Sequence, residues 1–152
     1  MILSTLRQLS INDMAGAIQL SLAPVFLLNG IAVLLSMLTS RLARIVDRAR
    51  TLEHQLDAAG GTHAPEVLRV LGNIRRRARL MNIAITLSTF SALLVALVVA
   101  LMFGSALVGI SLAELVGLAF IISMLSLVGA LVTFLIEVRV ATAALRIGPS
   151  KY

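Results

Sequence analysis

The chain has 152 residues, of which 59% are hydrophobic and only 13% are charged, about half the charged share of a soluble domain. A soluble protein of this size cannot bury so much apolar surface, and the absence of cysteine excludes a disulfide framework and thiol chemistry. The formal net charge of +6 does not indicate nucleic-acid binding, because most of the arginines lie near the ends of long apolar stretches, where they meet lipid phosphates.

The first apolar stretch predicts a membrane span. Residues 1–13 form a short amphipathic segment that we expect at the membrane interface. Span one follows at residues 15–38 and contains Pro24. This apolar run is too long for a signal peptide, and no clear small-residue cleavage site follows it, so we expect the cell to retain it.

Residues 39–79 keep a helical period outside the membrane. An apolar stripe lies on each side of the Gly60-Gly61 break, and Pro65 suits the first turn of the helix that follows. The two stripes are Leu42, Ile45, Ala49, Leu52 and Leu56, then Val67, Val70, Leu71, Ile74, Ala78 and Met81. They predict an antiparallel, coiled-coil-like helical hairpin formed by extensions of spans one and two.

Two further spans complete a single membrane domain over residues 1–152. No charged residue occurs between Arg79 and Glu114. We expect span two at residues 80–103, a turn at 104–111 and span three at 113–136. Asn82, Thr86 and Thr89 of span two share a face, as do Ser126, Gly129, Ala130 and Thr133 of span three, and both faces indicate helix packing. The fold class is therefore all-α, with three transmembrane helices.

The distribution of basic residues predicts the orientation. Residues 39–79 and the tail at 137–152 hold twelve of the thirteen basic residues. Both segments should therefore be cytoplasmic, with the N-terminal segment and the 104–111 turn outside.

Three motifs carry a resemblance to a known family. They are AIQLSLAP at 17–24, LTSRLARIVDRAR at 38–50 and RRRARL at 75–80. Together they resemble a family of small uncharacterised bacterial inner-membrane proteins, which has a domain of unknown function. The resemblance implies a three-span protein of the bacterial inner membrane and supplies no catalytic residues.

A polar stripe follows one face of span one. The pore-lining candidates on it are Gln19, Phe26, Asn29, Val33, Ser36 and Ser40. Polar groups inside a membrane face protein or water. The stripe therefore either lines an ion pathway in a symmetric oligomer or makes hydrogen bonds to neighbouring helices.

The arginines next to the membrane form a second group. Arg41, Arg44 and Arg48 make a cytoplasmic basic stripe, which either sets orientation and contacts lipid or rings a pore mouth. We expect anionic lipid head groups at Arg41, Arg44, Arg75, Arg76, Arg77 and Arg79.

Signs of catalysis or metal binding are absent from the sequence. His54 and His63 lack the spacing of a metal site, and Glu114 and Glu137 lie at the ends of span three, with Glu137 near Arg139. We therefore expect no enzyme activity, metal or cofactor. The sequence favours a homo-oligomeric ion channel lined by span one, and the alternative is a non-conducting structural module that binds lipid or a protein partner.

Topology is directly testable. Reporter fusions at Thr62, Gly109 and Tyr152 should read inside, outside and inside, because the basic residues hold residues 39–79 and 137–152 in the cytoplasm. An outside reading at Thr62 would contradict the predicted orientation.

Overall fold

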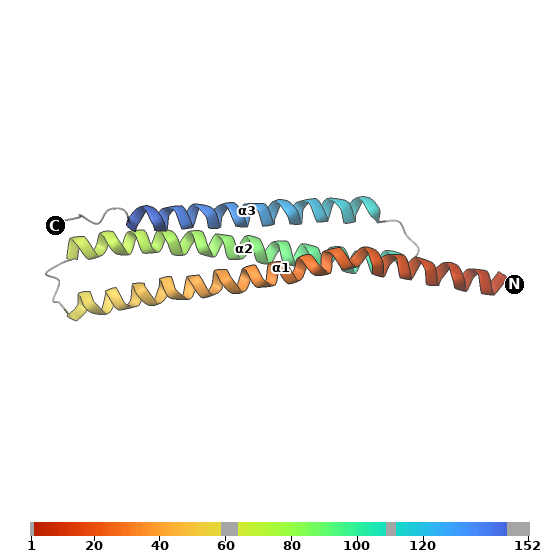
Figure 1. Ribbon diagram of the computed structural model, residues 1–152, viewed down its shortest axis with the longest axis horizontal. Helices are drawn as coiled ribbons and strands as arrows, with labels where there is room; N and C mark the ends of the chain where they lie inside the picture. Colours follow the sequence, from red (N-terminus) through yellow and green to blue (C-terminus); the bar gives the residue numbers. More distant parts are fainter. Residues whose placement is uncertain (1, 59–63, 109–111, 146–152) are drawn as a thin grey trace. The chain divides into compact units, whose positions relative to one another are not determined.

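The structure is almost entirely helical. The computed structural model describes residues 2–58, 64–108 and 112–145, and within these ranges all residues except Leu112 are helical. The three helices are α1 (Ile2–Ala58), α2 (Ala64–Val108) and α3 (Ala113–Leu145) (Figure 1).

Each of the three described helices is long and apolar enough to cross a membrane. The candidate spans are Ile18–Gln55, Arg69–Ser105 and Ala113–Thr142. Large apolar side chains remain exposed on them; Phe26 is 72% exposed and Leu125 is 67% exposed. Water penalises such exposure, but lipid does not. The prediction of an all-α protein with three membrane-length helices is confirmed, and the chain has the length and composition of a multi-pass membrane protein.

The helices run further than the predicted spans. Helix α1 begins at Ile2 and so includes residues 2–13 of the expected interfacial segment. Helix α2 continues to Val108, so the first part of the 104–111 turn is helical. Helix α3 continues to Leu145, within the expected tail. None of these extensions contains proline, and once a helix has formed each further residue adds a backbone hydrogen bond, which favours extending the helix. The predicted break at Gly60-Gly61 and residues 109–111 lie outside the described residues.

Unit 1 is one of two compact units and comprises Met1–Leu34 and Ser88–Leu127. Its interior holds the apolar side chains of Ile31, Val95 and Val98. Two buried serines join α2 to α3: Ser91 Oγ donates to the carbonyl oxygen of Ser123 at 2.9 Å, and Ser123 Oγ donates to that of Ser91 at 3.0 Å. Because each hydroxyl bonds to the other residue's backbone, the pair fixes the register of α2 and α3 within this unit.

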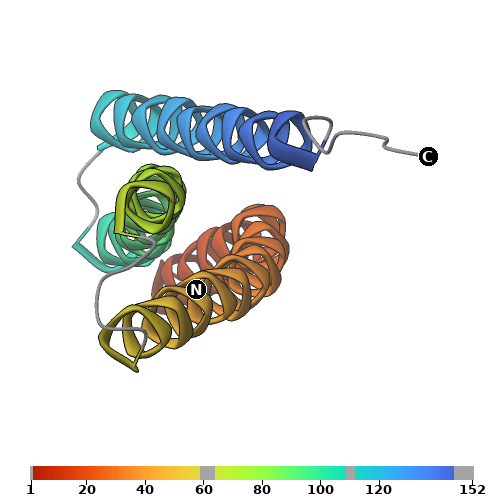
Figure 2. The ribbon, with the colours of Figure 1, turned by 90° about the vertical axis from the view of Figure 1, so that its left-hand side faces the viewer.

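Unit 2 comprises Leu35–Leu87 and Val128–Tyr152. Here α2 lies between α1 and α3 (Figures 1 and 2). Its buried apolar side chains are Leu38, Ile45, Leu71, Ile74, Met81, Ala84 and Ala130. Gly129 of α3 lies beside α2: a Cβ atom built on it would lie 3.5 Å from Leu87 Cδ1, which is an ordinary van der Waals contact, so this packing does not itself require glycine. Among the stripe residues predicted for the hairpin, Val70 is 40% exposed and does not join this interior.

The serine pair gives a stability prediction. Ser91→Ala and Ser123→Ala should each lower the free energy of unfolding by about 1 kcal/mol, because each removes an interhelical hydrogen bond. The double variant should lose less than the sum, because the two hydroxyls act together. Denaturation in mixed micelles, followed by circular dichroism, measures all three values. Ser40→Ala, at an exposed serine that bonds within its own helix, is the matched control. Strictly additive losses would contradict a coupled pair.

Candidate functional site

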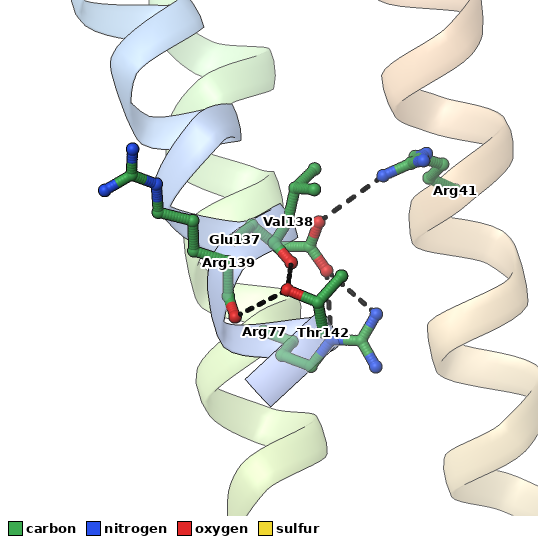
Figure 3. Close-up of polar contacts among 6 residues, drawn as sticks. All are labelled: Arg41, Arg77, Glu137, Val138, Arg139 and Thr142. Atoms are coloured by element: carbon green, nitrogen blue, oxygen red, sulfur yellow. Dashed lines mark hydrogen bonds and ion pairs between the residues drawn. The ribbon is translucent and has the colours of Figure 1, made fainter. Parts of the chain in front are cut away.

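A buried carboxylate lies at the centre of unit 2. Glu137 of α3 has no exposed surface, although it belongs to an apolar helix. Arg77 of α2 donates from Nε to Glu137 Oε1 at 2.9 Å, and its Nη2 lies 2.9 Å from the same oxygen (Figure 3). A buried charge is tolerated when it is paired and hydrogen-bonded, and Arg77 supplies both conditions.

A second arginine reaches Glu137 from α1. Arg41 Nη1 lies 3.7 Å from Glu137 Oε2, which is an ion pair but not a hydrogen bond (Figure 3). The Arg41 guanidinium also lies 5.1 Å from the centre of the Phe134 ring, within cation–π range. Helix α3 therefore holds Arg41 through a carboxylate and a ring, while Oε2 accepts no hydrogen bond from any described residue.

Helical spacing brings these groups together. On α2, Arg77 lies between the buried residues Ile74 and Met81, about one turn from each. On α1, Arg41 lies one turn before the buried residue Ile45. The buried apolar residues fix which face of each helix points inward, and the adjacent arginines then lie at the edge of that face.

These residues line a pocket of about 400 Å³, which we call the basic pocket. Its described lining residues are Arg41, Arg44, Ile45, Arg48, Ile74, Arg77, Met81, Glu137, Val138, Ala141 and Thr142. Four guanidinium groups against one carboxylate leave three formal positive charges on this lining. Such a surface favours anions that accept hydrogen bonds, and the planar guanidinium group suits carboxylates and phosphates.

A comparison with known families covers this whole region. A family model described as "Protein of unknown function (DUF2721)" matches residues 21–147. The chain belongs to this family. The matched range of the DUF2721 model includes every described residue that lines the basic pocket. No curated protein matches the chain, and no solved structure matches it.

The predicted polar stripe of span one lies on the surface. In unit 1, Gln19 and Asn29 are exposed, and the apolar positions Phe26 and Val33 are 72% and 66% exposed. In unit 2, the remaining candidates, Ser36 and Ser40, are also exposed. The interior of the single chain therefore includes none of these six residues, and their role as pore-lining residues stays a prediction.

The basic pocket separates the arginines of the predicted basic stripe and the predicted lipid contacts into two groups. Arg41, Arg44 and Arg48 all line the basic pocket, together with Arg77. The other three arginines for which we expected lipid contact are exposed and do not line it; they are Arg75, Arg76 and Arg79.

Sequence reasoning missed the role of Glu137. We expected it near Arg139, but Arg139 is exposed and its side chain points away from the carboxylate (Figure 3). Residues two apart on a helix lie on different faces, so Arg139 cannot pair with Glu137 without distortion. The available signal was a carboxylate far from the first turn of an apolar helix, since such a group requires a partner from another helix.

The buried ion pair generates a second stability prediction. Arg77→Met should lower the free energy of unfolding by about 2 kcal/mol or more, because it leaves Glu137 buried without its main donor. Adding Glu137→Gln should recover much of this loss, since the uncompensated charge is then gone. Chemical denaturation in mixed micelles, followed by circular dichroism, measures both effects.

Arg139→Met is the control for this prediction. It removes an exposed arginine close to Glu137 along α3 and should change stability by less than about 0.5 kcal/mol. If Arg139→Met destabilises the protein as much as Arg77→Met, the assigned pairing is wrong.

Proposed function

We propose that the protein assembles as a homo-oligomer in a membrane and conducts ions along a pathway lined by span one. The observation that carries this proposal is the exposure of polar side chains on α1. Gln19 and Asn29 are exposed within the candidate span Ile18–Gln55. An amide side chain facing lipid forfeits its hydrogen bonds, so these groups favour a cover of protein or water.

A second copy of the chain is the simplest cover. Three spans are too few to enclose a pathway within one chain, so conduction requires assembly around an axis. With α1 facing that axis, Gln19 and Asn29 supply polar rings, and Phe26 and Val33 supply apolar constrictions between and beside them. Ser36 and Ser40, which belong to unit 2, add two further polar positions to this face of α1.

The alternative is a non-conducting structural module that binds lipid or a protein partner. Under this alternative, the α1 stripe makes hydrogen bonds between subunits and encloses no pathway. The basic pocket favours the alternative, because its excess of guanidinium groups suits an anionic ligand.

The proposed setting is the bacterial inner membrane. It rests on the three motifs at residues 17–24, 38–50 and 75–80 together with the basic-residue distribution. The N-terminus lies outside and the C-terminus in the cytoplasm. The parts of α1 and α2 within residues 39–79 form the cytoplasmic hairpin, with Ile45, Leu71 and Ile74 as its buried apolar residues.

Conduction is tested by paired substitutions on α1. Asn29→Leu should lower ion flux in liposomes, because it joins two apolar constrictions into one longer dry segment. Phe26→Ala should raise the flux, because it widens an apolar constriction. Oligomer size, measured in the same preparations, should not change for either variant.

Leu20→Ala serves as the control, since Leu20 is 67% exposed on another face of α1. Under the non-conducting alternative, Asn29→Leu instead removes an intersubunit hydrogen bond of about 1 kcal/mol and loosens the oligomer. An intact wild-type oligomer that passes no monovalent or divalent ion over a range of voltages would count against the channel.

A further inference from the structure

We infer that the basic pocket binds the phosphate-bearing head group of an anionic phospholipid that carries a hydroxyl group, such as phosphatidylglycerol. This inference depends on the membrane location and not on ion conduction. It assigns a ligand to a site built by all three helices within unit 2.

The charges of the pocket call for an anion. Arg77 is committed to Glu137 Oε1, and Arg41 lies between Glu137 and the Phe134 ring. Arg44 and Arg48 also line the pocket, but they form no ion pair with any described residue. Two guanidinium groups on adjacent turns of α1 are thus available to donate to phosphate oxygens.

The buried carboxylate calls for a donor on the same ligand. Glu137 lines the pocket, and its buried Oε2, which lies 3.7 Å from Arg41 Nη1, accepts no hydrogen bond from the described residues. A buried acceptor without a donor is costly, and a ligand hydroxyl removes that cost. A simple anion without a donor would bind to the arginines but would leave Oε2 without a hydrogen bond.

The size and lining of the pocket favour a lipid head group over a free ion. About 400 Å³ falls within the roughly 300–1,000 Å³ range of organic-ligand pockets. The described lining also includes the apolar side chains of Ile45, Ile74, Met81 and Val138, which suit the carbon atoms of a glycerol group and not a bare phosphate. A bare phosphate would leave most of this volume to water.

The position of the pocket favours a ligand that comes from the membrane. Its lining residues lie within the candidate spans Ile18–Gln55, Arg69–Ser105 and Ala113–Thr142. On α3, Glu137 follows directly after the exposed apolar residues Leu135 and Ile136. A charged pocket next to apolar helix surface matches the boundary at which phospholipid phosphates lie.

Native mass spectrometry of the full-length protein tests the inference. The protein is purified in neutral detergent and titrated with phosphatidylglycerol, and the number of retained lipids is counted. Arg44→Gln with Arg48→Gln should weaken retention about tenfold or more, because two charged donors are lost. Both residues are exposed, so the fold should survive, and circular dichroism confirms it.

The matched control is Arg50→Gln with Arg69→Gln, which removes the same charge from two exposed arginines that neither line the pocket nor belong to the expected lipid contacts. This pair should retain phosphatidylglycerol as the wild type does. Equal losses for the two pairs would overturn the site and indicate general attraction between basic protein and anionic lipid.

Two further ligands test the role of the head-group hydroxyl and distinguish a lipid phosphate from free phosphate. Phosphatidylmethanol has the same charge as phosphatidylglycerol but no head-group hydroxyl, so it should bind more weakly; equal binding would overturn the role of Glu137 Oε2. Inorganic phosphate should not displace the lipid at comparable concentration. Displacement by phosphate would overturn the lipid assignment, and these results do not depend on whether liposomes show ion flux.

Discussion

Glu137 imposes the constraint on which unit 2 depends. A carboxylate without solvent exposure must receive charge-assisted hydrogen bonds from another helix, because its own apolar helix offers it none. Arg77 meets this requirement and thereby fixes the rotation of α2 against α3. Arg41 then joins through the second carboxylate oxygen and the Phe134 ring. One buried charge thus accounts for the placement of three side chains and for a wall of the basic pocket.

Polar contacts fix how the helices pack because apolar packing discriminates poorly between alternative rotations of α3. Helix α3 is apolar on all faces, so many rotations about its axis bury similar surface against its neighbours. In lipid, apolar burial also gives little driving force, since lipid tails resemble leucine. The Ser91–Ser123 pair in unit 1 and the Glu137–Arg77 pair in unit 2 each specify one register. The two units solve the same problem with different chemistry, one with neutral hydroxyls and the other with charges.

Local patterns and long-range pairs differ in how far the sequence predicts them. Three long apolar runs were enough to predict three membrane-length helices, because span length follows from membrane thickness. The contact residues were harder. Asn82 and Thr86 indicated helix packing in span two, yet both are exposed and Thr86 bonds to the carbonyl oxygen of Asn82 in its own helix. The buried serines, Ser91 and Ser123, gave no signal, because serine is common on membrane helices and its partner depends on register.

Prediction from the sequence has the same limit at the basic pocket. The spacing of Arg41, Arg44 and Arg48 predicts a stripe on one side of α1, and all three residues line the basic pocket. The pairing of Glu137 with Arg77 joins residues sixty positions apart. Helical periodicity describes one helix at a time and contains no information on how two helices are rotated against each other.

The order of the three charged residues along the chain bears on how the protein is made. Arg41 and Arg77 are synthesised before Glu137, because a chain grows from its N-terminus. A nascent chain that ends before α3 therefore carries both guanidinium groups without the carboxylate that joins them. The contacts that join Arg41 and Arg77 through one carboxylate can therefore form only after α3 has been synthesised.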